Sequence, residues 1–127
     1  MTTFFEQGHK SLAKALVGRK LMVGGIEVEI LSAQGFSRKE NEAPLYEPIL
    51  SKVPGEVYCP RNRGAILLLV ACQDVSLPGG CVLIRKVKIG EVEHNGPGKV
   101  TEALGITEHK SEGQLREVRG KLVLEMD

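Results

Sequence analysis

The sequence predicts an α+β fold, a single domain with a central, mostly antiparallel β-sheet and a few short helices. Two observations lead to this fold class. Short apolar runs separated by glycine-containing turns recur along the chain, as expected for strands joined by hairpins. One stretch near the N-terminus instead carries apolar residues at helical spacing. The length of 127 residues, 42% of them apolar, is sufficient for one domain, which we assign to residues 1–127.

The individual elements follow from periodicity and from the turn residues between them. Leu12 and Leu16 lie one helical turn apart, and the following Gly18 can adopt the left-handed conformation that ends a helix. Gly24-Gly25 favours a two-residue hairpin turn between two strands. The predicted helices cover residues 5–17 and 99–104, and the predicted strands cover residues 19–23, 26–32, 65–72, 81–89 and 121–126, the last at an edge of the sheet.

The remaining segments are predicted to be irregular. Residues 35–53 mix charges and prolines with few adjacent apolar residues, which indicates an exposed loop. Leu77–Gly80 is predicted to be a turn because it contains a Pro-Gly-Gly sequence. Residues 108–117 are polar and are expected to be helical in part. The almost continuously apolar residues 65–72 predict a strand that is buried on both faces.

Charge and cysteine content limit the functional classes. The net charge is +1 and the isoelectric point about 7.7, whereas a dedicated nucleic-acid-binding domain usually exceeds about 9. A local basic face remains compatible with these totals, because salt screens charges beyond about 10 Å. The three cysteines, Cys59, Cys72 and Cys81, are odd in number and include no C-x-x-C spacing, which indicates neither a zinc site nor a disulfide framework. Cys72 and Cys81 lie in or beside apolar runs and are predicted to be buried thiols.

No run of 18 apolar residues and no N-terminal signal sequence are present, so we expect no membrane contact. The expected location is the cytoplasm, or the nucleus of a eukaryote. His9, His94 and His109 share no metal-ligand spacing and are expected to be exposed to solvent. Neither a metal site nor a Ser-His-Asp triad is indicated.

Arg85 is the most informative residue, because it interrupts an apolar face. Strand alternation places Arg85 between Leu83 and Val87, where an unpaired guanidinium would be costly. Glu29 and Glu27 lie on the polar face of an earlier strand and are candidate partners. A Glu29–Arg85 pair at the sheet surface is therefore predicted, either as a structural ion pair or as part of a functional site.

Two short motifs could contact an anion. Pro60-Arg61-Asn62-Arg63-Gly64 places two arginines in a turn, which suits phosphate contacts, although a solvated turn has the same composition. Gly96-Pro97-Gly98-Lys99 precedes a predicted helix and can present backbone amides to an anion. The second motif is not the P-loop pattern and is weak by itself.

Several segments, in this order along the chain, resemble the alkyladenine (3-methyladenine) DNA glycosylase family. The most specific match is Gly96–Ile106, which is similar to the family's G-P-[GS]-K-L-x-x-A-L-[GA]-I. The weaker matches are Leu12–Leu21 with its opening helix and strand, Ile26–Glu29 with its glutamate strand, Pro60–Gly64 with P-R-N-R-G, and Val82–Arg85 with V-L-[LI]-R-A. The family's fold is related to the C-terminal domain of methionyl-tRNA formyltransferase.

The resemblance implies a protein of DNA base-excision repair. Family members flip a damaged purine such as 3-methyladenine out of the duplex, and a glutamate activates the water that hydrolyses the N-glycosidic bond. An arginine helps to position that water. By motif position these catalytic roles fall on Glu29 and Arg85. The implied DNA contacts are Arg61, Asn62, Arg63, Gly98 and Lys99. No metal or other cofactor is implied.

The sequence departs from the family pattern in the base pocket. Leu31 stands at the position of the tyrosine that stacks on the flipped base, and the tyrosines of the family's wedge hairpin have no equivalent. Cys72 or Gln73 lies nearest to the asparagine that discriminates against guanine. The chain ends at Asp127, whereas family members continue for several tens of residues.

Two function classes therefore stay open. The first is a glycosylase-like hydrolase that acts on an alkylated or deaminated purine in DNA. The second is a non-catalytic module that binds DNA, single-stranded nucleic acid or RNA, which the missing tyrosines favour. A homodimer is a further alternative, because a short chain would leave a sheet edge exposed.

Overall fold

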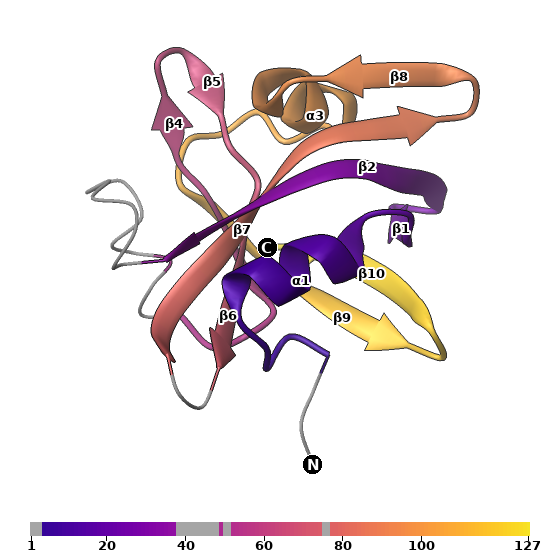
Figure 1. Ribbon diagram of the computed structural model, residues 1–127. Coiled ribbons are helices and arrows are strands. Elements are labelled where there is room, and N and C mark those ends of the chain that lie inside the picture. Colours follow the sequence, from indigo (N-terminus) through magenta and orange to yellow (C-terminus); the bar gives the residue numbers. More distant parts are fainter. Residues whose placement is uncertain (1–3, 38–48, 50–51, 75–76) are drawn as a thin grey trace.

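The strands of the computed structural model close on themselves to form a barrel, with one helix packed across it and a second helix at one end (Figure 1). The structure describes residues 4–37, 49, 52–74 and 77–127. The helices described in full are α1 (His9–Leu16) and α3 (Pro97–Ala103). The described strands are β1 (Lys20–Val23), β2 (Ile26–Ser37), β3 (Glu56–Cys59), β4 (Arg61–Asn62), β5 (Ala65–Ile66), β6 (Leu69–Asp74), β7 (Leu77–Ile89), β8 (Val92–Asn95), β9 (Ser111–Val118) and β10 (Lys121–Met126).

Seven of these strands form the closed ring. Their order is β2-β1-β10-β9-β3-β6-β7, and β7 pairs again with β2, while β8 extends from β7. Among the pairings of the described strands, β1–β10 alone is parallel, so the predicted mostly antiparallel sheet is confirmed. The described chain is mostly β with two short helices, and its closure into a barrel was not predicted. β10 has a neighbour on each side and is not the predicted edge strand.

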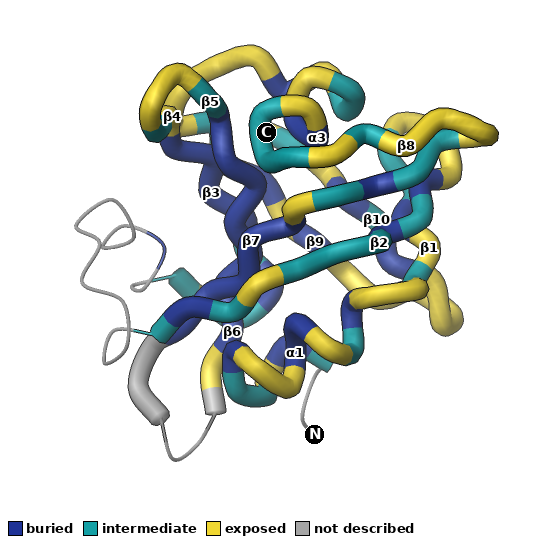
Figure 2. Tube along the Cα trace, turned by 45° about the horizontal axis from the view of Figure 1, so that its top comes forward, coloured by how far each residue is buried: buried dark blue, intermediate teal, exposed yellow. Residues whose placement is uncertain are grey.

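Apolar side chains form two clusters. One includes residues of all seven ring strands and therefore lies inside the barrel, and the other lies on the outer face. Figure 2 shows how far each position along the chain is buried. Leu12 and Leu16 of α1 and Val100 of α3 join the inner cluster. The members of the outer cluster are Phe36, Ile49, Tyr58, Leu67, Leu69, Ala71, Cys81 and Leu83. Residues Leu69–Cys72 of β6 alternate between the clusters, so both faces of the strand are buried there, as the apolar run predicted. The single strand predicted for residues 65–72 is divided, because residues 65–66 form β5 and β6 begins at Leu69.

The N-terminal boundaries differ from the prediction. The helix begins at His9 rather than Phe5, because Gly8 is extended and the Phe5 side chain is buried in the core before the helix starts. His9 is itself buried, so its predicted exposure is wrong. The positive φ of +88° at Gly18 confirms the predicted left-handed residue after the helix.

Three later predictions are also corrected. The predicted turn at Leu77–Gly80 is wrong, because these residues begin β7 and pair with β6. The segment expected to be partly helical forms β9, whose polar residues face solvent while Leu115 is buried. Of the predicted loop at residues 35–53, residues 35–37 belong to β2, and residues 38–48 and 50–51 lie outside the described residues.

Among the described residues, three hairpins have two-residue turns with positive φ at both positions. These angles are +56° and +86° at Gly24-Gly25, +51° and +83° at Arg63-Gly64, and +52° and +81° at Arg119-Gly120. Positive φ at both central residues matches the twist of antiparallel strands. Glycine is suited to this conformation, whereas each arginine adopts it at a steric cost of about 1 kcal/mol or more. Within the described residues no helix has the length and apolar character needed to span a membrane.

Candidate nucleic-acid interface and candidate catalytic residues

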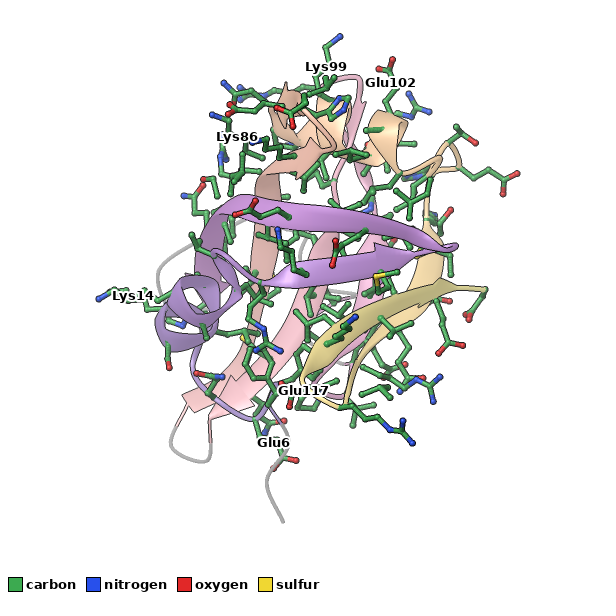
Figure 3. The ribbon with its side chains drawn as sticks, turned by 90° about the vertical axis from the view of Figure 1, so that its right-hand side faces the viewer. Glu6, Lys14, Lys86, Lys99, Glu102 and Glu117 are labelled. Carbon is green, nitrogen blue, oxygen red and sulfur yellow. The ribbon has the colours of Figure 1, made fainter. Side chains whose placement is uncertain are left out.

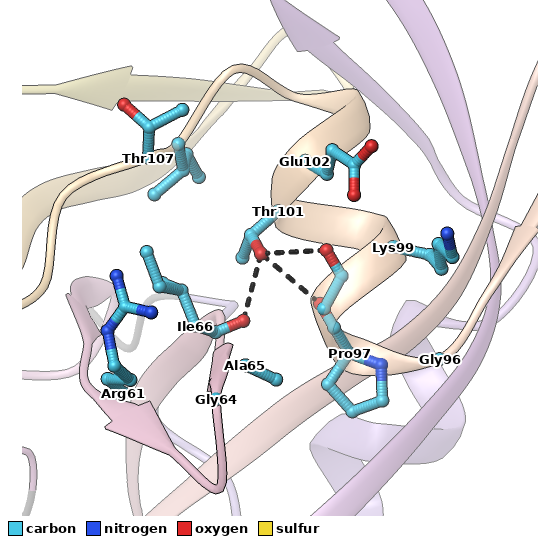
Figure 4. A pocket seen from close by; sticks show the side chains of 12 residues that line it. Arg61, Gly64, Ala65, Ile66, Gly96, Pro97, Lys99, Thr101, Glu102 and Thr107 are labelled. Carbon is cyan, nitrogen blue, oxygen red and sulfur yellow. Dashed lines mark hydrogen bonds between the residues drawn. The ribbon is translucent and has the colours of Figure 1, made fainter.

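The arginine turn and the Gly96–Lys99 motif, although far apart in sequence, meet at one end of the barrel (Figure 4). The arginine turn is the β4–β5 hairpin, and α3 packs against β5. The buried Thr101 hydroxyl of α3 donates a hydrogen bond to the carbonyl of Ile66 at 2.9 Å. Between the two elements lies a hollow of about 440 Å³, which we call the hairpin–helix hollow. Its lining includes Arg61, Ile66, Lys99, Glu102, Ile106 and Thr107.

Gly98 allows the helix to pack closely on the hairpin. A Cβ atom added to Gly98 would lie 3.1 Å from the Cβ of Ala65, which is tighter than ordinary van der Waals contact. The structure thus gives this predicted DNA-contact residue a packing role. The side chains that can reach a phosphate come instead from its neighbours.

The basic side chains flank the hollow on opposite sides. Figure 4 shows Arg61 on the hairpin side, whereas Lys99 projects from the far side of α3 together with Glu102. Arg63 is exposed at the tip of the hairpin, and Asn62 is half-buried and pairs with β5. Lys86 and Lys99 lie at this end of the molecule, and the acidic residues Glu6 and Glu117 lie at the other end (Figure 3).

Arg85 lies at a β-bulge, which changes its surroundings from those predicted. The pairing of β2 with β7 is irregular at two places and leaves Leu31 and Arg85 outside the register of paired residues. The bulge shifts the alternation, so that Val87 faces the barrel interior whereas Leu83 belongs to the outer cluster. Arg85 is therefore exposed, and its predicted position on an apolar face is wrong.

Both the side chain and the backbone of Arg85 make hydrogen bonds. Its Nη1 donates to Oε1 of Gln34 at 2.9 Å. Its carbonyl accepts from the amide of Gly96 at 2.8 Å. Because Gly96 lines the hairpin–helix hollow, the backbone of Arg85 borders the region that holds the arginine turn and α3.

Glu29 lies in a row of alternating charges that crosses four strands. Its register neighbours are Lys20 of β1 and Lys88 of β7, and Lys88 is in turn paired with Glu93 of β8. Lys20 Nζ lies 3.4 Å from Glu29 Oε1. At the end of the row, a hydrogen bond from Lys86 and the positive charges of Lys86 and Lys88 lower the pKa of Glu93. This row gives Glu29 a structural role on the barrel surface.

The predicted contact between Glu29 and Arg85 is not formed. In the described part of the chain, Glu29 pairs with Lys20, and Arg85 donates to Gln34. Three positions on β7 separate Arg85 from Lys88, the register partner of Glu29, which corresponds to about 10 Å at ~3.3 Å per residue. Both side chains point outward, because adjacent residues on their strands face the barrel interior. The two groups share a face without touching.

The three residues predicted for the base pocket do not gather at one place. Cys72 is buried inside the barrel, and burial raises the pKa of its thiol to about 12. Gln73 is exposed, and its backbone N–H donates to the carbonyl of Phe5. Leu31 is half-buried at the bulge. The strand pairings with β7 place Cys72 of β6 at the same level of the sheet as Ser37 of β2. Ser37 lies about 20 Å along β2 from Leu31, at ~3.3 Å per residue.

Sequence reasoning missed the contacts that the side chains of Lys20, Gln34, His109 and Thr101 make with predicted site residues. His109 Nδ1 accepts a hydrogen bond from the backbone amide of Arg61 at 3.0 Å. The alternating charges on either side of the predicted hairpin turn were the available signal for Lys20. Neither Gln34 nor His109 stands at a sequence spacing that marks its contact. No group of three or more His, Cys, Asp and Glu side chains within the described ranges is arranged to hold a metal ion.

The chain is similar to a curated protein of Lactobacillus johnsonii that is named "Putative 3-methyladenine DNA glycosylase". The two sequences are 29% identical, and the similar region covers 86% of this chain and 56% of that protein. This similarity supports a distant relationship to a protein of that name. The resemblance found in the motifs is thereby confirmed. No protein-family model matches the chain.

The similarity covers only part of the relative. Because this chain spans about half of that protein's length, the activity and substrate of the whole protein are proposals for this chain. The structure divides the glycosylase-like residues into two groups. The arginine turn and the glycine motif adjoin one hollow, whereas Glu29 and Arg85 bind other partners on the barrel surface.

Proposed function

We propose that this chain is a DNA-binding relative of the 3-methyladenine DNA glycosylases, and that it contacts the DNA backbone through its hairpin–helix surface. We define this surface as Arg61, Asn62, Arg63 and Lys99. The observation that carries the proposal is that Arg61 and Lys99, from two motifs far apart in the sequence, line the same hollow. Guanidinium and ammonium groups are the main phosphate-binding side chains of proteins.

The attraction has to be local, because the net charge of the whole chain is only +1. Glu102 lines the same hollow and opposes a phosphate there. We therefore expect Glu102→Gln to strengthen DNA binding by a few-fold at low salt, since it removes a like charge without changing the shape of the side chain. Measurement of the dissociation constant by fluorescence anisotropy tests this expectation.

The main experiment measures the salt dependence of binding to a short DNA duplex. Arg61→Ala combined with Arg63→Asn is expected to weaken binding and to reduce the slope of log K against log salt by roughly 1.8, because each lost phosphate contact contributes about 0.9. Single-stranded DNA and RNA of the same sequence are measured in parallel to identify the preferred nucleic acid.

The matched control removes the same charge from the other Arg-Gly hairpin. Arg116→Ala combined with Arg119→Asn alters the β9–β10 hairpin, whose turn lies away from α3 (Figure 1). This control is expected to keep most of the wild-type slope. Equal losses in both double variants would show that overall charge, and not the hairpin–helix surface, controls binding, and would overturn the proposed interface.

A second candidate function is hydrolysis of the N-glycosidic bond of an alkylated or deaminated purine. The bulge that carries Arg85 and Leu31 favours it, because bulges often redirect side chains beside active sites. In this proposal Glu29 removes a proton from water, the water oxygen bonds to the sugar carbon, and the purine leaves with the electron pair of the broken bond. Arg85 would have to exchange Gln34 for this water.

The test is release of hypoxanthine or 3-methyladenine from damaged DNA. Glu29→Gln is expected to reduce release by roughly 100-fold or more, as for loss of a general base. Glu27→Gln is the matched control, because Glu27 lies two residues away on the same strand and is exposed. Absence of release by the wild type, or equal release by Glu29→Gln, would leave DNA binding as the function.

A further inference from the structure

We infer that His109 is a positioning residue for the hairpin–helix surface, and that its neutral imidazole holds the first residue of the β4–β5 hairpin in place. The inference rests on the proposed function of that surface. The backbone amide of Arg61 donates to Nδ1 of His109 at 3.0 Å, which is an ordinary hydrogen-bond distance. The amide of Lys110 donates to the carbonyl of Cys59 at 2.9 Å. The loop before β9 is thus bonded to the chain at two points around Pro60.

The contact specifies the protonation state of the ring. An imidazole nitrogen accepts a hydrogen bond only when it carries no proton, so His109 must be neutral with its proton on Nε2. Protonation turns Nδ1 into a donor, which would then face the N–H donor of Arg61. The ring would have to turn away, and the contact would be lost.

The β4–β5 hairpin depends on few bonds, because each of its strands has only two residues. The Thr101–Ile66 bond attaches β5 to α3. The amide of Leu67 donates to the carbonyl of Pro60 at 2.9 Å and closes the base of the hairpin. Among the hydrogen bonds that the structure describes, the one to His109 connects β4 to a segment outside the hairpin. Its loss would therefore loosen the strand that carries Arg61.

Protonation of His109 would change DNA affinity in two opposite ways. The added positive charge beside Arg61 attracts DNA, whereas loss of the contact to the Arg61 amide weakens binding. The ionisable side chains on the segments that meet at His109 are Arg61 on β4, Arg63 in the hairpin turn, Glu56, Tyr58 and Cys59 on β3, Glu108 and Lys110 in the loop, and Glu112, Arg116 and Glu117 on β9. Because the two effects differ in sign, the direction of the pH dependence distinguishes them.

The first experiment compares DNA affinity between about pH 7.5 and pH 5.5, the interval in which histidine ordinarily titrates. His109→Asn is the conservative variant, since its amide oxygen can accept from Arg61 and does not titrate. We expect the wild type to lose affinity relative to His109→Asn by about threefold to tenfold as the pH falls, as for loss of one hydrogen bond. His109→Ala should be weak at every pH.

His94→Asn is the control for histidine charge elsewhere, because His94 lies on β8. It should keep the wild-type pH profile. An affinity that rises as the pH falls in the wild type but not in His109→Asn would show that added charge dominates, and would overturn the inference. The same conclusion follows if His109→Asn and the wild type have identical profiles.

A second measurement separates this inference from the proposed function. Hydrogen exchange of the Arg61 amide is followed by NMR in the free protein, where no DNA is needed. We expect protection at neutral pH in the wild type, loss of protection in His109→Ala, and protection at both pH values in His109→Asn. Protection that does not depend on His109 overturns the inference whatever happens with DNA. Absence of DNA binding, with protection as expected, overturns the proposed function alone.

Discussion

Two turns of this molecule have the same two residues and almost the same backbone but different neighbours. Arg63-Gly64 and Arg119-Gly120 differ by only 1–2° in φ at each position. The first turn belongs to a short hairpin that packs against α3 and borders the hairpin–helix hollow. The second joins two longer strands of the barrel itself. Arg19 stabilises this second turn by donating a hydrogen bond to the carbonyl of Gly120 at 2.8 Å.

The comparison shows that an arginine in a turn does not by itself define a site. Both turns are exposed and both carry a positive charge. The difference is that a second segment, α3, packs beside the first hairpin, and its Lys99 lines the same hollow. In the second turn the neighbouring Glu117 already pairs with Arg19 at 2.9 Å. A DNA-binding role of the first turn therefore depends on the packing of α3 against β5, and mutations at this contact test that dependence.

The largest expected effect comes from Thr101→Val, which removes the hydroxyl that joins α3 to β5. The variant keeps the shape of the side chain but loses a buried hydrogen bond, so we expect a loss of about 1–3 kcal/mol in the free energy of unfolding. DNA affinity should fall as well. Chemical denaturation and anisotropy measure the two effects. Thr107→Val changes an exposed threonine of the same hollow and should leave both quantities near the wild type.

Gly98→Ala is the next test, because it acts on the same contact by adding a methyl group. The new Cβ would approach the Cβ of Ala65 to 3.1 Å, which we expect to reduce the free energy of unfolding by about 1 kcal/mol. Ala65→Gly removes the opposing methyl group. Thermal unfolding of the double variant should recover part of the loss. A double variant that is no more stable than Gly98→Ala would show that the close approach is not the cause.

The sequence predicted the individual turns and motifs better than their positions relative to one another. The type of each hairpin turn follows from its own residues, and Gly24-Gly25 was found in this way. Two separate motifs and a family resemblance predicted Arg61 and Lys99 as DNA contacts. Neither motif indicated that they would share a hollow, because Thr101 and Ile66 meet only through the tertiary fold.

The Glu29–Arg85 prediction failed for a physical reason that no residue spacing reveals. Strand alternation can place Glu29 and Arg85 on the same face, but it does not give the register between their strands. In the structure Glu29 is opposite Lys88, three positions from Arg85, and the irregularity between β2 and β7 leaves Arg85 without a register partner on β2. The charge row that holds Glu29 also needs β1 and β8 beside β2 and β7, which depends on closure of the barrel.

A smaller effect on stability is expected when the hydrogen bond from Arg19 to the second turn is removed. Arg19→Met eliminates the bond to Gly120 and the ion pair with Glu117, both of them exposed. We expect a loss of about 0.5–1 kcal/mol in the free energy of unfolding, because exposed pairs contribute little. DNA binding should change no more than in Lys14→Met, which removes an exposed charge from α1. A much larger loss of binding in Arg19→Met would place DNA on this second turn.

The smallest expected effect on stability is also the sharpest test of the comparison. Arg63→Asn and Arg119→Asn each introduce a residue that tolerates positive φ better than arginine does. Since the two backbones are alike, we expect both variants to gain up to about 0.5 kcal/mol, and by nearly equal amounts. DNA affinity should fall in Arg63→Asn alone. Unequal gains in thermal unfolding would mean that one arginine makes a stabilising contact in the folded protein. Equal losses of DNA affinity would mean that α3 does not distinguish the two turns.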